Sequence, residues 1–436
     1  MQFLYLRDIF LTPIFVLFLL AIVWRLRRRM SDPEKAIYFV PAFAYKVLGA
    51  IALGLIYQFY YGGGDTYYYY MDGVVMASQS IETALMIIFR PMDYTEKHFA
   101  LTYALVYFGD GPSFMISRIS GFFSLLSGQT YTINAICFAL YSFAGSWQLF
   151  RVLSDRYPHL KRSMALATLF LPSTFFWGSG LLKDSITFGA LGFVFYHLYF
   201  GLMRGRRPLV HLCWFLVHAW LIWSIKSYII QMFIPAFGLW LYVQFQQKIP
   251  VAATRFLLGL FQLLVFVGLA YLAVRSVGDE LTQRLDEIGK KAKVTSEWIQ
   301  YMSSEGTAYY IGELDGTFTG MLGYFPRAVV VAFFRPGLWE VRNPLMLLAA
   351  LENTVLLWLV LRLLLRTPPF RWPGIFRRDP YLLFALVYAL LFGFLVGITS
   401  GNFGTLARYK IPMLPFFASF LLILSAPKAT KPSSTP

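Results

Sequence analysis

Apolar stretches of membrane-spanning length recur along this chain, and they constrain its fold more than any other feature. A helix needs roughly twenty apolar residues to cross the hydrocarbon core of a bilayer. Of the 436 residues, 58% are hydrophobic and only 14% are charged, whereas soluble domains carry about a quarter charged residues. So much apolar surface needs lipid around it, and the sequence therefore predicts an all-α membrane protein.

The length criterion predicts about eleven transmembrane helices. The expected spans are residues 9–24, 40–60, 131–149, 164–181, 186–203, 209–224, 228–243, 256–275, 344–363, 380–398 and 411–425. The first stretch has no basic region before it and no small-residue cleavage site after it, so we expect it to be retained as a span. The transmembrane domain is then predicted over residues 1–425.

Lysines and arginines collect in the loops that follow alternate spans. These basic clusters are Arg25, Arg27, Arg28, Arg29 and Lys35; Arg151, Arg156, Lys161 and Arg162; Arg204, Arg206 and Arg207; Lys248 and Arg255; Arg362, Arg366, Arg371, Arg377 and Arg378; and Lys428 and Lys431. The positive-inside rule places them in the cytoplasm, with the N-terminus outside and a disordered tail, 426–436, inside. We expect a multi-pass protein of the bacterial inner (plasma) membrane.

The formal net charge of +16 could indicate either nucleic-acid binding or contact with the membrane. Basic residues in short loops between apolar segments report topology and contact with anionic lipid headgroups. That pattern does not indicate nucleic-acid binding, so membrane lipids are the expected partners of these charges and nucleic acid is not.

Two predicted outer loops are long, at about residues 61–130 and 276–342, and loops of this length are often functional. In the first, the apolar pieces 81–90 and 99–126 are interrupted by Gly109, Gly111, Pro112 and Gly121. In the second, residues 278–300 have the pattern of an amphipathic helix and residues 329–334 are too short to cross. We expect interfacial helices in both loops.

Asp65 is the most conspicuous acidic residue of the first loop. Three glycines precede it and four tyrosines, at positions 67 to 70, follow closely. Such glycines let the backbone turn sharply, and a carboxylate presented at the membrane surface can act as a general base or hold a divalent cation. The alternative is an interfacial turn beside a belt of tyrosines.

Lys183 and Asp184 lie in a predicted outer turn that also contains glycines and hydroxyl groups. A cation beside a helix N-terminus can bind a phosphate or pyrophosphate. The two side chains are alternatively the polar cap of a helical hairpin, with Asp184 capping the next span.

Arg408 and Lys410 precede the last span and lie on the predicted outer side, against the positive-inside rule. Their retention there favours an anionic ligand, because arginine suits bidentate phosphate contacts and lysine supplies a point charge. Anchoring of lipid headgroups is the alternative.

Arg335 and Glu340 precede the ninth predicted span, and Glu352 lies inside it. An ionisable group within a membrane is costly and marks a functional hypothesis, so Glu352 and Asp184 are potential intramembrane polar sites. Arg335 is a further potential phosphate ligand. A structural ion pair of Glu352 with Arg335 or Lys183 is the alternative.

Other chemistries find little support in the sequence. The five histidines show no metal-ligand spacing, and both cysteines, Cys137 and Cys213, fall within predicted spans. The chain contains no nucleotide-binding P-loop, nucleophile elbow or metalloprotease motif, which argues against nucleotide hydrolysis and proteolysis.

The position of Asp65 after an early span, the long later loop and the Arg-Tyr-Lys-Ile-Pro-x-x-Pro segment at 408–415 together resemble polytopic GT-C glycosyltransferases. The resemblance implies transfer of a sugar from a polyprenyl-phosphate carrier to a glycan, lipid or protein acceptor on the outer face. It implies Asp65 as catalytic acid/base and Arg408 or Lys410 as ligands of the carrier phosphate. Asp65 is followed by Thr66 rather than a second acid, so any cofactor, such as a divalent cation, stays unknown.

Two alternatives stay open. Enzymes that polymerise lipid-linked O-antigen or exopolysaccharide repeats also use outer arginines and long outer loops. A secondary transporter or flippase would instead be expected to have ionisable groups and broken helices near the midplane of the membrane. Here the polar residues gather at the predicted outer rim, with Glu352 as the main exception.

Overall fold

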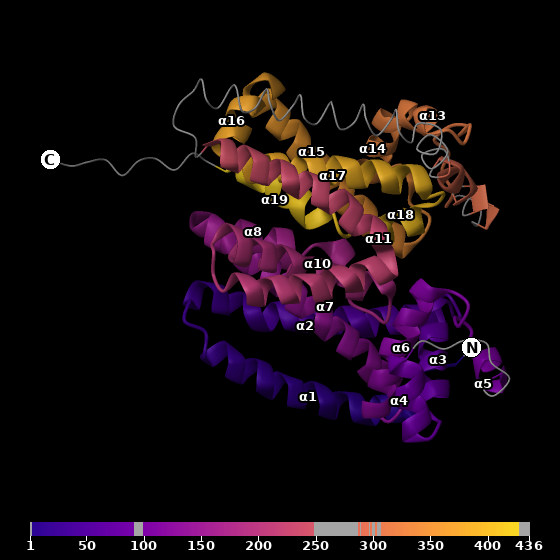
Figure 1. Ribbon diagram of the computed structural model, residues 1–436. Helices are drawn as coiled ribbons and strands as arrows, with labels where there is room; N and C mark the ends of the chain where they lie inside the picture. Colours follow the sequence, from indigo (N-terminus) through magenta and orange to yellow (C-terminus); the bar gives the residue numbers. More distant parts are fainter. Residues whose placement is uncertain are drawn as a thin grey trace. The chain divides into compact units, whose positions relative to one another are not determined.

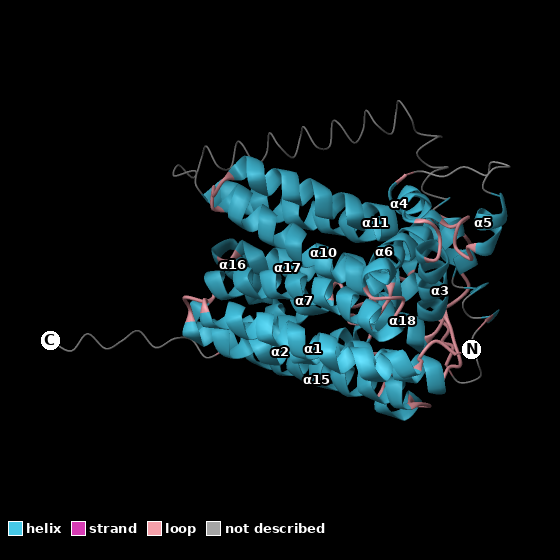
Figure 2. Ribbon diagram, turned by 90° about the horizontal axis from the view of Figure 1, so that it is seen from below, coloured by secondary structure: helices cyan, strands magenta, loops and turns pink. Residues whose placement is uncertain are grey.

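The computed structural model describes residues 2–90, 99–247, 287, 289–295, 297–298, 301–302 and 307–426. These residues form helices joined by loops, with one isolated bridge between Ala308 and Asn402 in place of any strand (Figure 2). The chain divides into two compact units, Met1–Ile230 and Gln231–Pro436, and each is described by itself. The predicted span 256–275 and residues 427–436 of the predicted tail lie outside the described residues.

Seven described helices are long and apolar enough to cross a membrane, or eight if a bent pair counts as one crossing. The chain is therefore an all-helical integral membrane protein, with fewer such helices among the described residues than the eleven expected. The seven are α1 (Leu6–Arg28), α2 (Pro33–Phe59), α7 (Tyr131–Arg156), α10 (Lys183–His197) with its π-helical extension Leu198–Met203, α11 (Pro208–Gln247), α15 (Pro344–Arg366) and α17 (Pro380–Thr399) (Figure 1).

Three predicted spans differ from the observed helices for local reasons. Residues 164–181 are divided between α8 (Lys161–Leu169) and α9 (Pro172–Phe176), because Leu171 is extended before a proline. The two predicted spans 209–224 and 228–243 fall on either side of Lys226, whose φ of −146° and ψ of 73° interrupt α11.

The last predicted span is bent rather than straight. It is made of α18 (Phe403–Tyr409) and α19 (Leu414–Ser425), which meet at an angle of 71°. Pro412 and Pro415 flank this junction and disfavour a continuous helix. Lys410 lies at the bend.

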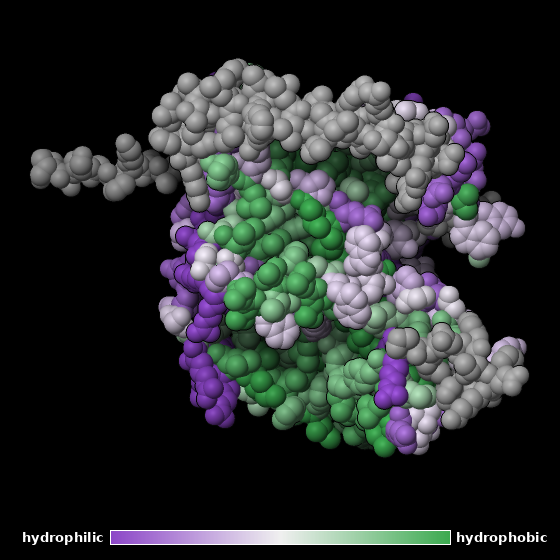
Figure 3. Space-filling view, in the orientation of Figure 1, coloured by the Kyte–Doolittle hydropathy of each residue, from purple (hydrophilic) through white to green (hydrophobic). Residues whose placement is uncertain are grey.

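In the first unit, α7 packs closely against α10 while α1 exposes most of its apolar side chains (Figure 1). A Cβ on Gly145 would lie 1.9 Å from the carbonyl oxygen of Gly189, so only glycine allows this approach of the two helices. Hydrophobic side chains form a band over the long helices of this unit, and hydrophilic side chains gather where the α1–α2 loop lies (Figure 3).

The basic clusters of the first unit meet at one end of its helices. Lys161 at the start of α8 pairs with Asp32 before α2 at 3.2 Å, and Arg204 after α10 pairs with Asp155 at the end of α7 at 2.5 Å. Lys183, at the other end of α10, contacts Asp110 in the first long loop. We call the end that carries Lys161 and Arg204 the basic end.

The described residues of the first long loop form four short helices, none of which reaches spanning length. They are α3 (Asp65–Ala77), α4 (Ile81–Phe89), α5 (Phe99–Ala104) and α6 (Gly111–Leu126). α3 and α6 pack against each other, and a small apolar core forms around Met76, Ile87 and Phe114. These helices hold the loop at the end of the unit where Asp65 lies.

The second unit packs α14 (Phe325–Phe334) against α17, and α15 and α17 against α19. α14 is apolar but shorter than a span, as expected for residues 329–334. Only part of the predicted amphipathic helix 278–300 is described, and residues 289–295 are helical. The remaining short helices are α13 (Phe318–Gly323), α16 (Trp372–Arg378) and the 3₁₀ turns Pro158–Leu160, Leu338–Glu340 and Pro369–Arg371.

Candidate functional site

Asp65 is the first residue of α3, directly after a turn of three glycines. Gly62, Gly63 and Gly64 have φ angles of 70°, 142° and 125°. A Cβ on Gly64 would also lie 2.9 Å from the Tyr57 ring, so both the conformation and the space require glycine there. The turn places the Asp65 carboxylate in the first turn of α3, where the helix dipole favours negative charge.

One polar group that contacts this carboxylate comes from a distant part of the same loop. The hydroxyl of Tyr107 donates to Asp65 Oδ1 at 3.4 Å, and the Tyr107 ring lies 4.7 Å from the ring of Tyr69. Burial, followed by the neighbouring Asp65 charge, raises the pKa of Tyr107. Tyr107 therefore remains a proton donor to Asp65 at neutral pH.

Asp72 holds the Tyr107 segment in position. Its carboxylate is 1% exposed and accepts hydrogen bonds from the Val106 N–H at 2.7 Å, the Tyr107 N–H at 3.1 Å and the Ser117 hydroxyl at 2.7 Å. Asp72 lies seven residues after Asp65 and thus on the same face of α3, two turns along. We infer that it positions Tyr107 beside Asp65.

Asp72 was not among the predicted site residues, because no glycines precede it as they precede Asp65. The spacing of seven residues was the available signal, because it places two carboxylates on one helix face. What no local pattern shows is that three donors from residues 106 to 117 converge on Asp72.

Lys183 is connected to the same loop. Its ammonium lies 3.5 Å from Asp110 Oδ2, and Asp110 in turn donates its N–H to the Tyr107 carbonyl at 3.0 Å. Ser113 also donates to Asp110. Asp65, Tyr107, Asp110 and Lys183 thus form a connected set, called here the Asp65 network.

Asp184 turns away from this network although it is the next residue. Its carboxylate forms an ion pair of 2.5 Å with Lys226, and both side chains are buried. Lys226 is the residue at which α11 is interrupted. The pair therefore stabilises a helix break inside the first unit.

Arg335 belongs to the second unit and lies in a cage of aromatic and acidic side chains. Its guanidinium donates to both carboxylate oxygens of Glu340 and lies 5.1 Å from the Phe403 ring and 5.7 Å from the Tyr309 ring. The segments that carry these rings pair through the Tyr309 N–H and the Gly401 carbonyl at 3.0 Å. We call Arg335, Glu340, Tyr309 and Phe403 the Arg335 cage.

Lys410 is completely buried at the bend between α18 and α19. Its ammonium donates to Asn353 Oδ1 at 2.5 Å, and its charge interacts with the carboxylate of Glu352. Asn353 also donates to the Pro336 carbonyl at 3.1 Å, next to Arg335. Arg408, two residues earlier on α18, is half-buried.

The predicted site residues therefore fall into two groups, each inside one unit. Asp65 and Lys183 join the Asp65 network, while Arg335, Glu352, Arg408 and Lys410 lie in the second unit. Arg335 forms an ion pair with Glu340, and Lys183 forms one with Asp110. The charge of Glu352 interacts with that of Lys410.

Three histidines that sequence analysis left scattered come together in the first unit. His197 and His211 share a hydrogen bond of 2.9 Å between their Nδ1 atoms, and His218 bonds the Tyr141 hydroxyl at 2.8 Å. Within the described part of the chain, no group of three or more histidine, cysteine or acidic side chains is arranged to hold a metal ion.

Comparison of the chain with protein-family models, with curated proteins and with solved structures returned no match.

Proposed function

We propose that this protein is a membrane glycosyltransferase that moves a sugar from a polyprenyl-phosphate carrier to an acceptor hydroxyl, with Asp65 as the general base. The observation that carries the proposal is the Asp65 network. A glycine turn holds one carboxylate at the start of α3, and a tyrosine hydroxyl and a lysine are linked to it through neighbouring loop residues.

The reaction assigns a distinct task to each member. Asp65 takes the proton of the acceptor hydroxyl, the acceptor oxygen bonds to the anomeric carbon, and the bond from that carbon to the phosphate oxygen breaks. The carrier phosphate leaves with the electron pair. Lys183 is close enough to this loop to offset the negative charge of a phosphate.

Within the second unit, Arg335 and Arg408 are proposed as phosphate-binding residues. About a third of the Arg335 side chain is exposed, and Arg408 is half-buried. Lys410 is a weaker choice than the resemblance implied, because its buried ammonium is already bonded to Asn353. A phosphate would have to displace that amide.

The decisive experiment compares purified Asp65→Asn with wild type in transfer from a polyprenyl-phosphate sugar. Loss of a positioned general base reduces turnover by roughly a hundredfold to ten-thousandfold. Glu82→Gln is the matched control, because Glu82 is an exposed carboxylate in the same loop. Monodisperse elution in detergent reports folding. Wild-type turnover by folded Asp65→Asn would remove the basis of the mechanism.

The donor used in this assay separates transferase from polymerase. Activity with a single sugar on a polyprenyl phosphate supports the transferase. Activity only with an oligosaccharide on a polyprenyl diphosphate, extended into longer chains, would identify a polymerase that uses the same carboxylate.

A transporter is the second candidate, and the bend at Lys410 favours it. Discontinuous helices with buried ionisable groups are typical binding sites of secondary transporters, and here Lys410 and Glu352 lie beside the break between α18 and α19. Proteoliposomes distinguish the two functions. Substrate uptake that Lys410→Met abolishes and Asp65→Asn leaves intact would favour transport.

A further inference from the structure

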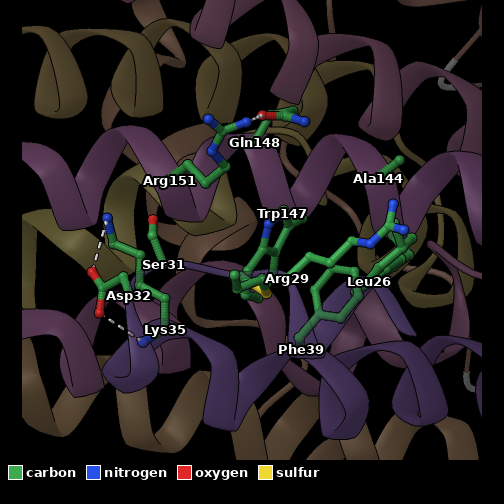
Figure 4. Close-up of a pocket in the computed structure, with 12 residues that line it drawn as sticks. Leu26, Arg29, Ser31, Asp32, Lys35, Phe39, Ala144, Trp147, Gln148 and Arg151 are labelled. Atoms are coloured by element: carbon green, nitrogen blue, oxygen red, sulfur yellow. Dashed lines mark hydrogen bonds and ion pairs between the residues drawn. The ribbon is translucent and has the colours of Figure 1, made fainter. Parts of the chain in front are cut away.

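A cavity of about 570 Å³ opens at the basic end of the first unit, between α1, α2 and α7 (Figure 4). This volume lies within the usual range for small-ligand pockets, roughly 300–1,000 Å³. The cavity is separate from the Asp65 network, which lies at the other end of α10. Its residues are not used by the proposed transfer reaction.

Each of the three helices contributes one face, and each face changes from polar to apolar in the same direction. On α2, Lys35 near the helix end is followed by Phe39; on α7, Arg151 at the end is preceded by Trp147 and Phe143. These residues are spaced by four and therefore line up along one face. The cavity thus has a cationic mouth and an aromatic interior.

The aromatic interior is tightly built. The Phe39 ring lies 4.8 Å from the Trp147 ring and 5.2 Å from the Phe143 ring. Ala144 leaves space beside them, and Leu26 of α1 closes the wall (Figure 4). The outer face of α1 exposes Leu17 and Phe18 at more than 60% each, as a lipid-facing helix would.

Positive charge predominates at the mouth. Arg29, Lys35 and Arg151 line it, against one carboxylate, Asp32. Asp32 is already engaged, because it caps α2 through the Glu34 N–H at 3.1 Å and pairs with Lys161 at 3.2 Å as well as with Lys35 at 3.4 Å.

The two arginines differ in what holds them. Arg151 donates to Gln148 at 2.9 Å and lies over the Tyr196 ring, whereas the Arg29 guanidinium forms no hydrogen bond or ion pair with the part of the chain that the structure describes. An anion in the cavity would supply Arg29 with a partner of opposite charge.

We propose that this cavity binds an anionic phospholipid, with its phosphate at Arg29 and Arg151 and the first part of its acyl chain against Phe39 and Trp147. A basic pocket between transmembrane helices is the usual form of a lipid headgroup site. The amphipathic lining selects a phosphate that carries an apolar chain, because a soluble phosphate would leave the aromatic interior unfilled.

The test titrates delipidated, detergent-purified protein with dioctanoyl phosphatidylglycerol, dioctanoyl phosphatidylcholine and glycerol 3-phosphate, and counts bound ligand by native mass spectrometry. The expected result is at least about tenfold tighter binding of phosphatidylglycerol than of phosphatidylcholine, since charged hydrogen bonds are at stake. Glycerol 3-phosphate is expected not to displace the lipid. If it displaces the lipid at equal concentration, the lipid assignment is wrong.

Variants locate the site. Arg29→Gln and Arg151→Gln are each expected to weaken phosphatidylglycerol binding about tenfold. Ala144→Trp should also weaken it, by filling the interior without a change of charge. Arg162→Gln is the matched control, because Arg162 is exposed at the same basic end but does not line the cavity. Equal loss in Arg162→Gln, or no loss in the Arg29→Gln/Arg151→Gln double variant, would overturn the proposal.

Discussion

The Asp65 network of the first unit and the polar groups around Lys410 in the second unit satisfy their charges in opposite ways. Beside the Asp65 network, the buried carboxylate is Asp72, and its hydrogen bonds come from two backbone N–H groups and a serine hydroxyl. In the second, the buried charge is the Lys410 cation, bonded to the side-chain amide of Asn353.

This difference separates supporting residues from those that can act on a ligand. All the cited hydrogen bonds of Asp72 position the Tyr107 segment. Asp65, which Tyr107 contacts, is partly exposed and can therefore reach a substrate. In the second unit, Lys410 is enclosed by its contacts, and Arg335 is held by Glu340 and two aromatic rings. We therefore expect substitution of Asp65 to alter activity first and substitution of Lys410 to alter stability first.

The largest stability effect is expected for Lys410→Met. Removing this buried cation takes away the donor to Asn353 Oδ1 and the positive charge that interacts with the Glu352 carboxylate. Breaking a buried charged contact by deleting one partner costs about 3–5 kcal/mol. Thermal unfolding in detergent, followed by intrinsic fluorescence, measures the loss.

Two further variants test whether this loss comes from the contact between Lys410 and Asn353. Lys291→Met is the control, because Lys291 is an exposed lysine of the same unit. The double variant Lys410→Met/Asn353→Leu should lose less than the sum of its single variants, since both partners of the contact are then apolar. Additive losses would show that Lys410 and Asn353 do not act as a pair.

A smaller loss is expected for Ser117→Ala in the first unit. Ser117 is fully buried and supplies one of the three hydrogen bonds to Asp72, and a hydrogen bond to a charged group contributes about 1.5–3 kcal/mol. The same unfolding measurement applies. Sugar transfer should fall by less than in Asp65→Asn, because two backbone donors still hold the Tyr107 segment.

Ser113→Ala is the matched comparison for Ser117→Ala. Its hydroxyl donates to Asp110, whose carboxylate is about half exposed and can bond to water instead. An effect of Ser113→Ala as large as that of Ser117→Ala would contradict the assignment of Asp72 as the supporting residue of the loop.

The smallest effects are those of pH, and the two units are expected to respond with opposite signs. Burial acts to raise the pKa of Glu340, but hydrogen bonds from Arg335 and the Gly337 N–H outweigh it and hold the pKa below its ordinary value. The stability that Glu340 contributes is thus present above its unfolded pKa and is lost as the pH falls through the folded value.

Asp72 gives the reverse dependence. Burial raises the pKa of Asp72 despite the hydrogen bonds from Ser117, Val106 and Tyr107. Its contribution is fully present below the unfolded pKa and is lost as the pH rises through the folded value. Glu340→Gln and Asp72→Asn should therefore change the slope of stability against pH in opposite directions over the acidic range.

The Glu340 effect is expected to be below about 1 kcal/mol, because the Arg335 side chain is one-third exposed and solvent screens the pair. Unfolding midpoints collected in steps across the acidic range, for both variants and wild type, give the two slopes. Slopes of the same sign would contradict the comparison between the units.

Some of the fold could be predicted from local sequence. The predicted spans 9–24, 40–60, 131–149, 344–363 and 380–398 correspond to α1, α2, α7, α15 and α17. Helix breaks were harder to predict, because Lys226 interrupts α11 with no proline or glycine at that position. Its ion pair with Asp184, far away in the sequence, accounts for a buried lysine there.

The sequence by itself determined that the chain is a helical membrane protein, that its cations cluster at helix ends and that glycines present Asp65. These properties depend on the length of apolar stretches, on residue type and on neighbours in the chain, so they can be predicted from local sequence. The tertiary structure alone decided that Asp72 supports Tyr107, that Lys410 is bonded to Asn353 and that Arg29 and Arg151 line one cavity. Each of these depends on side chains far apart in sequence, and helix packing alone sets which of them meet.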